Sequence, residues 1–371
     1  MADRAFAARH SYRLPSLSGT LPMTLRLKLT CTALFALLSC LVTAPAVQAE
    51  PRDFPTDLVG LNFSGAGFAP HVLPGKPGTN YFFPDAGHYR RWSAKGIRVI
   101  RFPVIWERLQ PRLGQPLDPV YAKLIDQTLD HAKRYRMSVI LDLHNYMRYR
   151  GQVIGSAAVP YPAYADVLRR IAQRWHAHPA LAAYDIMNEP HDAVEQWPIA
   201  AQHGIDAVRD VDRARPILIE GNGWSSSYLW PRYNAKLLGL KDPADNLIYS
   251  AHVYFDNDGG GKYLRKDMTD FDPDVGIRRV EPFITWLKQH GKRGHIGEFG
   301  VPDNDPRWLA AMDRLLARLR KECIPAMYWA AGPNWGDYPL AIEPVKGKPR
   351  PQWAVLQKYV KPADCADVGP R

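Results

Sequence analysis

Short apolar stretches alternate with amphipathic ones through most of the chain, and this alternation limits the possible folds more than any other feature. Eight stretches are predicted to be strands, at 57–63, 97–104, 137–144, 181–187, 216–222, 246–254, 294–300 and 324–332. Apolar residues spaced by three and four predict helices at 87–96, 118–136, 161–178, 193–212, 277–291, 306–322 and 351–359. A helix within 225–238 is a weaker prediction because Pro231 interrupts it.

Strands that are apolar on both faces and separated by helices indicate a parallel sheet covered on both sides. Eight such units match a single (β/α)8 TIM barrel of the α/β class, which is our predicted fold. A doubly wound open sheet is the alternative, and it usually carries a glycine-rich phosphate turn after its first strand. Gly65 and Gly67 follow the first predicted strand, but no helix start follows them.

The first 49 residues have the pattern of a secretory signal peptide. Arg26 and Lys28 precede an apolar run from Leu29 to Val42, and a small-residue cleavage site ends at Ala49. We therefore expect a signal peptide over 1–49, with Met23 as a possible start, and a catalytic domain over 50–371. Cleavage before Cys40 as a lipoprotein is the alternative to plain secretion outside the cytoplasm.

The composition excludes some classes of protein. The formal net charge of +11 is scattered, without a basic run or zinc-ligand spacing, so we expect no nucleic-acid partner. No apolar run after residue 49 is long enough to span a bilayer, and we expect a monomer without a membrane span. Cys323 and Cys365 follow the leader, and the sequence leaves open whether they form a disulfide or remain thiols.

Polar and aromatic residues stand at the end of nearly every predicted strand, where barrel enzymes place their active sites. Each has a possible structural role alone, since Glu298 could pair with Arg101 and a lone histidine is commonly a core residue. If all of these residues had only structural roles, their gathering at one rim of the barrel would require a separate coincidence for each residue. They are Arg101, His144, Asn145, Asn188, Glu189, Glu220, Asn222, His252, Tyr254, Glu298 and Trp329, with Trp106 and Trp224 just beyond strand ends.

Two glutamates facing one cleft suit the hydrolysis of a glycosidic bond. One carboxylic acid protonates the leaving oxygen, and an ionised carboxylate attacks the anomeric carbon. Arg101 and Tyr254 could hold Glu298 ionised, Asn188 could bind a sugar hydroxyl, and Trp329 could stack on a sugar ring.

These motifs resemble glycoside hydrolase family 5, which contains many bacterial cellulases. The resemblance rests on "RFPVIW", "LDLHNY", "YDIMNEP", "SAHVY", "HIGEFG" and "YWAAG", in the family's order, over about residues 57–359. It implies a retaining enzyme without a cofactor or metal, with Glu189 as acid/base and Glu298 as nucleophile. It also implies supporting roles for Arg101, His144, Asn188, His252, Tyr254 and Trp329.

The resemblance favours an endo-β-1,4-glucanase acting on cellulose or another β-glucan. The segment 328–344 resembles the last loop of that branch, and Trp335 and Tyr338 in it are either sugar platforms or loop packing. Trp224 and Trp230 are weaker platform candidates. An endo-β-mannanase is the nearest alternative, and a non-catalytic carbohydrate-binding barrel a distant one. A metal-dependent hydrolase would show closely spaced histidines, and a serine esterase would show Gly-x-Ser-x-Gly, neither of which is present.

Overall fold

The structure is a computed structural model that describes residues 53–264, 269–361 and 364–370. All of them belong to one compact unit, Gln48–Arg371. The predicted signal peptide lies outside the described residues. Among the helices that the structure describes, none is both long and apolar enough to cross a membrane.

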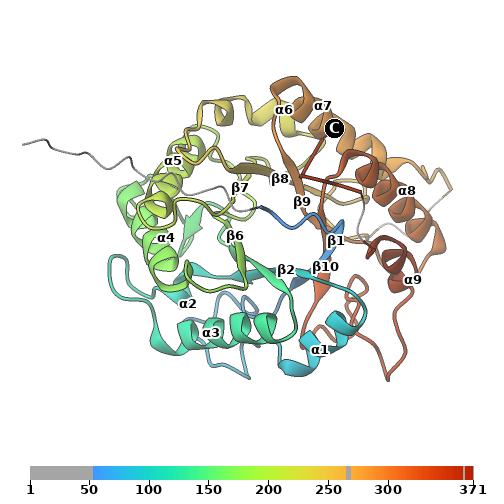
Figure 1. Cartoon of the computed structure of the whole chain (residues 1–371), viewed down its shortest axis with the longest axis horizontal. Coiled ribbons are helices and arrows are strands. Elements are labelled where there is room, and N and C mark those ends of the chain that lie inside the picture. The colour runs from blue at the N-terminus through green and yellow to red at the C-terminus, as the bar shows by residue number, and fades with distance from the viewer. Residues whose placement is uncertain (1–52, 265–268, 362–363, 371) are drawn as a thin grey trace, which may run out of the picture. The chain divides into compact units, whose positions relative to one another are not determined.

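Eight parallel strands form a closed barrel, which confirms the predicted TIM barrel and excludes the open sheet. Their order around the barrel is β1-β10-β9-β8-β7-β6-β3-β2, and β1 pairs with β2 to close it. In Figure 1 the strands lie in the middle and the helices surround them. The strands are β1 (Val59–Phe63), β2 (Val99–Val104), β3 (Ser138–Leu143), β6 (Leu181–Asp185), β7 (Ile217–Glu220), β8 (Leu247–Val253), β9 (Gly294–Phe299) and β10 (Ala326–Ala331).

Capping residues mark the ends of several helices. Asp118 accepts a hydrogen bond from the backbone N–H of Tyr121 at 2.8 Å and so caps α3, which Pro119 begins. Gly291 ends α7 in the left-handed conformation that a residue without a Cβ adopts readily. The main helices are α1 (Ala86–Ala94), α3 (Pro119–Arg134), α4 (Tyr161–Trp175), α5 (Gln196–Arg209), α7 (Val275–His290), α8 (Pro306–Glu322) and α9 (Gln352–Leu356).

Several short elements differ from the prediction or were absent from it. The weak helix within 225–238 is a single turn, α6 (Trp230–Tyr233), followed by a 3-10 helix (Ala235–Gly239). One helical turn, α2 (Trp106–Leu109), follows β2, and a 3-10 turn (Gln357–Tyr359) follows α9. A hairpin of two-residue strands, β4 (Arg148–Tyr149) and β5 (Gln152–Val153), follows β3. Segments this short have no room for a hydrophobic period.

The floor of the barrel is a separate apolar cluster. It consists of inward-facing residues near the starts of six strands, with one residue from each end of the described chain: Val99, Ile140, Ala183, Leu218, Ile248, Met327, Phe54 and Val368. All are buried. The two terminal segments therefore close the end of the barrel at which the strands begin.

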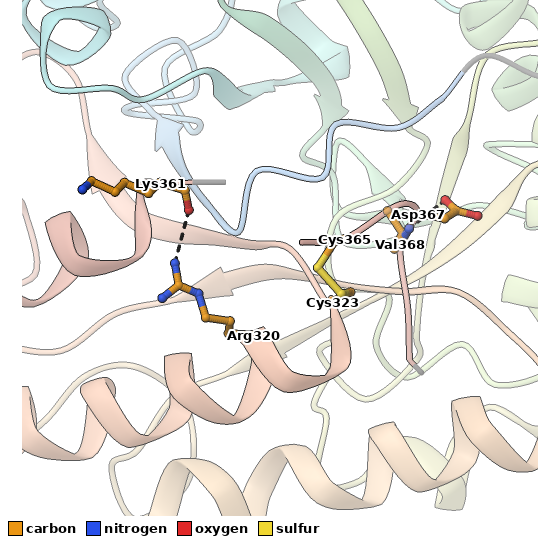
Figure 2. The surroundings of a disulfide bond; sticks show 6 residues. All are labelled: Arg320, Cys323, Lys361, Cys365, Asp367 and Val368. Carbon is orange, nitrogen blue, oxygen red and sulfur yellow. Dashed lines mark hydrogen bonds between the residues drawn. A yellow bond between two sulfur atoms is a disulfide. The ribbon is translucent and has the colours of Figure 1, made fainter. Parts of the chain in front are cut away.

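A disulfide between Cys323 and Cys365 fixes the C-terminal segment beside this floor (Figure 2). Cys323 follows the last residue of α8, and its carbonyl accepts a hydrogen bond from the N–H of Gly369 at 2.9 Å. Gly369 in turn accepts from the N–H of Gly294 at the start of β9, at 2.8 Å. The disulfide thus holds Val368 in the floor, which answers the question that the sequence left open.

Candidate active site

Four charged residues and one serine form the layer directly above the apolar floor. Side chains of a strand alternate between its two faces, so residues two positions beyond the floor residues share their inward face. In five strands these positions carry buried polar residues: Arg101, Asp142, Asp185, Glu220 and Ser250. The layer therefore separates the floor from the cleft at the carboxyl ends of the strands.

Arg101 is the centre of this layer and is fully buried on β2. Burial opposes its charge, but the surrounding carboxylates outweigh that effect and raise its pKa well above the usual range. The guanidinium is therefore a fixed cation. Its nitrogens lie 2.8 Å from Asp185, 3.0 Å from Asp142, 2.9 Å from Glu220 and 3.0 Å from Glu298.

Glu298, on β9, receives two hydrogen bonds, one to each carboxylate oxygen. The Arg101 guanidinium donates to Oε1 at 3.0 Å, and the Tyr254 hydroxyl donates to Oε2 at 2.7 Å. Burial and the Glu298 charge raise the pKa of Tyr254 well above its usual range, so the hydroxyl keeps its proton. Both donors stabilise a negatively charged carboxylate.

Glu189 has a different environment. Its Oε1 lies 2.7 Å from Nδ1 of His252, and no arginine contacts its carboxyl group among the described residues. Burial raises the pKa of Glu189, His252 opposes that rise, and the charges of Glu298 and Glu220 add to it. The carboxyl group is therefore easier to protonate than an ordinary glutamate.

The backbone that carries Glu189 departs from our prediction. We expected the strand to continue to Met187, but β6 ends at Asp185. The segment then crosses to β3, where the N–H of Asn188 donates to the carbonyl of Leu143 at 2.9 Å. Glu189 itself has a left-handed φ of 44°, and its N–H donates to Glu220 Oε2 at 2.6 Å. This turn, rather than the strand, directs the side chain into the cleft.

Glu220 is the functional residue that our reading of the sequence undervalued. It accepts hydrogen bonds from Arg101 at 2.9 Å and from the Glu189 backbone, and it lies 2.9 Å from Nε2 of His252. Burial acts to raise its pKa, but the charges of His252 and Arg101 outweigh it and lower the pKa to about 2. Glu220 is therefore ionised and links the surroundings of both candidate glutamates.

His252 lies between three carboxylates. Burial lowers its pKa, but Glu220 and Glu298 outweigh burial and raise it well above the usual range. As an imidazolium, it donates from Nδ1 to Glu189 and from Nε2 to Glu220. One oxygen of Glu189, one of Glu298 and a ring nitrogen of His252 all lie within 4.8 Å of one another.

Two cavities meet at Glu189. One, of about 640 Å³, extends over the loops after β1 and β3 and includes His144, Asn145 and Tyr146. The other, of about 380 Å³, extends along the loop after β8 and includes His252 and Tyr254. Trp224 lines both cavities. A chain-like ligand can therefore pass Glu189 with room on either side.

The remaining predicted residues divide into two groups. Trp329 and His144 lie at the rim with their rings stacked at 5.7 Å, and Asp142 lies 2.7 Å from Nδ1 of His144. Asn188 is fully buried, and its Oδ1 accepts from Arg101 at 2.8 Å. Its Nδ2 is buried without a hydrogen-bond partner among the described residues, so it can still donate to a ligand.

Other residues have structural contacts. Asn145 Oδ1 accepts from the N–H of buried Trp106 at 2.7 Å, and its amide donates to Glu107 at 2.8 Å, so it fixes the loop at the cavity wall. Asn222 Oδ1 accepts from the N–H of Ala193 at 3.0 Å, and Asn222 is not among the residues that line either cavity.

The tryptophan residues that we predicted as sugar platforms have different surroundings in the structure. Trp230 as a sugar platform was wrong, because it is fully buried against Tyr249, Phe283 and Trp286. Trp335 stacks on Tyr338 at 4.8 Å and lies edge-on to Trp329 at 5.8 Å, so it extends the aromatic surface beyond Trp329. Trp224 stacks on His191 at 3.7 Å and is 51 % exposed, so one ring face is covered while much of the side chain faces solvent.

Comparison with known proteins agrees with this geometry. The model of the cellulase family (glycosyl hydrolase family 5) matches residues 62–335. The chain belongs to glycosyl hydrolase family 5. Curated relatives include endo-beta-1,4-glucanase B of Emericella nidulans, which is 32% identical over 82% of this chain and 92% of that protein.

Solved structures of the family superpose closely. Pseudomonas stutzeri endoglucanase Cel5A, in complex with cellobiose, has a TM-score of 0.83 and 50% identity, covering 87% of this chain and 98% of that chain. XacCel5A, in complex with cellopentaose, has a TM-score of 0.77 and 35% identity, covering 82% of this chain and 99% of that chain. Both of those proteins were solved with β-glucan oligosaccharides bound.

Proposed function

We propose that the protein is a retaining endo-β-1,4-glucanase that hydrolyses internal bonds of cellulose or a related β-glucan. The observation that carries the proposal is the contrast between two neighbouring carboxyl groups. Glu298 is surrounded by donors that favour its charge, whereas burial raises the pKa of Glu189 and favours its protonated form. A carboxyl group whose protonated form is favoured, beside one whose charge is stabilised by two hydrogen-bond donors, can provide the acid and the nucleophile of a glycosidase.

In the first step the Glu298 carboxylate attacks the anomeric carbon while Glu189 gives its proton to the glycosidic oxygen. The bond between that oxygen and the anomeric carbon breaks, and a glycosyl ester forms on Glu298. Hydrogen bonds from Arg101 and Tyr254 orient the attacking group, and the buried N–H group of Asn188 is placed to bind a sugar hydroxyl.

In the second step Glu189, now ionised, takes a proton from water. The water oxygen attacks the anomeric carbon and releases Glu298, so two inversions give net retention. The separation supports this course, because carboxyl groups about 5–5.5 Å apart leave no room for water between nucleophile and sugar. One oxygen of each glutamate lies within 4.8 Å of the other.

The cavities on both sides of Glu189 support cleavage within a chain rather than at its end. Trp329, Trp224 and Trp335 offer aromatic faces on which the apolar C–H faces of sugar rings can stack. The relatives named above, solved with cellobiose and cellopentaose, point to the same polymer class.

We also propose that residues 1–49 direct export and that residues 50–371 act as a monomeric catalytic domain outside the cytoplasm. The leader pattern and the disulfide between Cys323 and Cys365 support this, because structural disulfides persist in oxidising compartments. Cleavage after Ala49 would show as the N-terminal sequence Glu50-Pro51 in exported protein, whereas an acylated Cys40 would show a lipoprotein.

Proton NMR of a cellopentaose digest tests the proposed activity. We expect internal cleavage with the β-anomer released first, unaffected by a chelator. Early α-anomer would contradict retention. No cleavage of cellopentaose together with rapid cleavage of mannopentaose would replace the glucanase by a mannanase, and inactivity on both would favour a binding barrel.

A further inference from the structure

A second groove lies outside the cleft, between the loop after β7 and helix α7. Its volume is about 650 Å³. Tyr228 and Pro231 line it from the loop and α6. Residues spaced by three and four along one face of α7 form the other wall: Arg278, Glu281, Pro282, Thr285, Trp286 and Gln289. This face extends about 16 Å along the helix, enough for several linked sugar rings.

The exposed aromatic residues point to a connection between this groove and the cleft. Among the described residues, only Trp224 and Tyr228 are exposed aromatics, at 51 % and 59 %. They are four residues apart on one loop. Trp224 lines both cavities beside Glu189, and Tyr228 lines the outer groove. One short loop therefore presents an aromatic ring to each.

This loop is anchored at both sides. The N–H of Ser227 donates to the carbonyl of His252 at 3.0 Å, and the N–H of His252 donates to Ser225 at 2.7 Å. The Ser227 hydroxyl donates to the carbonyl of Arg279 on α7 at 2.9 Å. Tyr228 is thus held beside α7 before any ligand arrives, and a preorganised residue loses less entropy on binding.

The groove suits a neutral, hydroxyl-rich polymer. Thr285 and Gln289 are exposed, and their side chains have no hydrogen-bond partner among the described residues. These side chains can therefore bind hydroxyl groups. The two charged residues of the wall balance each other and have protein partners: Glu281 pairs with Arg318 at 3.2 Å, and Arg278 pairs with Asp272. An ionic ligand would find no unmatched charge, whereas a sugar ring needs an aromatic face and polar neighbours.

We propose that the groove centred on Tyr228 is a secondary binding site for the β-glucan polymer, which it holds while another part of the chain occupies the cleft. This inference rests on the proposed function, since it assumes a polysaccharide substrate. It adds a site at which only long chains gain affinity, because short oligosaccharides are accommodated within the cleft.

The test compares polymer with oligosaccharide in Tyr228→Ala. Affinity electrophoresis through soluble β-glucan, in a Glu298→Gln background that does not consume the polymer, measures binding. We expect Tyr228→Ala to weaken it about threefold to tenfold, the value of one aromatic contact. In the active enzyme KM for β-glucan should rise by a similar factor, while kcat/KM for cellotetraose should not change.

Two controls make the result specific. Tyr228→Phe keeps the ring and should bind the polymer like the parent. Ile199→Ala removes an exposed apolar side chain from α5 and should have no effect. Unchanged polymer binding in Tyr228→Ala, or an equal loss on cellotetraose, would overturn the secondary site. A parent enzyme that cleaves no β-glucan would instead refute the proposed function.

Discussion

The two ends of the barrel are built from different chemistry. The floor is apolar, sealed by Phe54 and Val368 and held by a disulfide, and its residues have no titratable group facing the interior. The other end is a network of charges around Arg101, with Glu298 and Glu189 at its surface. In each of five strands the polar residue stands only two positions beyond the apolar one.

This difference teaches where stability and activity reside. Apolar burial and a covalent crosslink hold the floor, whereas the carboxyl end depends on compensated buried charges. Changes at the glutamates that face the cleft should therefore remove activity and leave the fold. Changes at the floor should do the reverse, and changes in the charged layer between them should affect both.

The largest effect is expected for Glu298→Gln. Loss of a covalent nucleophile should reduce kcat on β-glucan on the order of 10⁴- to 10⁶-fold. The melting temperature should fall less than in a Glu220→Gln variant, because Glu298 faces the cleft and has one cation, Arg101, within 3.0 Å, whereas Glu220 has two at 2.9 Å. The exposed carboxylate of Asp192, three residues beyond Glu189, provides a control, and Asp192→Asn should keep near-parent turnover. A Glu298→Gln variant with residual activity of a few per cent would contradict the assignment.

Glu189→Gln should have a smaller effect that depends on the leaving group. Loss of a general acid should reduce the hydrolysis of cellopentaose by about 10²- to 10⁴-fold. A dinitrophenyl cellobioside needs no proton on leaving, so its burst of dinitrophenol should stay within about tenfold of the parent. Equal losses on both substrates would mean that Glu189 does not act as the acid.

Glu220→Gln tests the boundary between the two ends. Its carboxylate is fully buried between two cations, and removing one partner of such a network costs about 3–5 kcal/mol of unfolding free energy. We expect urea denaturation of the variant to show this loss of unfolding free energy. We also expect a reduced kcat, because His252 and the Glu189 backbone both lose a hydrogen-bond partner. Reduced kcat at unchanged stability would remove Glu220 from the structural layer.

The pH dependence of this effect has a defined sign. The pKa of Glu220 is about 2 in the folded protein, below its usual value of 4.5. Its contribution to stability is therefore complete above pH 4.5 and is lost as the pH falls from 4.5 towards 2. The difference in unfolding free energy between the parent and Glu220→Gln should shrink over this range, and a constant difference would contradict the pKa.

The smallest effect on activity is expected at the floor. Replacing Cys323 and Cys365 together by alanine opens a crosslink between residues 42 positions apart. In the chain-entropy model this lowers the unfolding free energy by about 4 kcal/mol. At a temperature where the variant stays folded, kcat and KM for β-glucan should match the parent. Lost activity in a folded variant would mean that the two ends are not independent.

Much of the fold could be predicted from the sequence, because apolar runs of strand length and amphipathic helices carry clear periods. The helix predicted at 306–322 has those bounds in the structure. The two ends of every predicted strand lie within two residues of the ends of the observed strand. The hairpin after β3 and the single turns α2 and α6 carried no such period. Whether the cysteines pair depended on a three-dimensional contact that spacing does not encode.

The site was predicted at the strand ends, but of the layer beneath them only Arg101 and Glu220 were among the predicted residues. Asp142 and Asp185 stand inside apolar strands, and both occupy the same inward position as Arg101. The sequence signal for this layer was the presence of aspartates in apolar strands at positions that match the position of Arg101 in its own strand. Trp230 was a candidate for the site that proved to be a core residue. The sequence around this tryptophan does not indicate whether its ring faces the cleft or the core.

The central claim is that Glu298 forms a covalent bond to sugar while Glu189 supplies the proton. Mass spectrometry of the protein treated with a dinitrophenyl 2-deoxy-2-fluoro-cellobioside tests it most directly, because the fluorine slows the second step and the ester accumulates. We predict that one fluorocellobiosyl group is found on the peptide containing Glu298. A label on Glu189, or rapid substrate turnover without any labelled protein, would contradict the account.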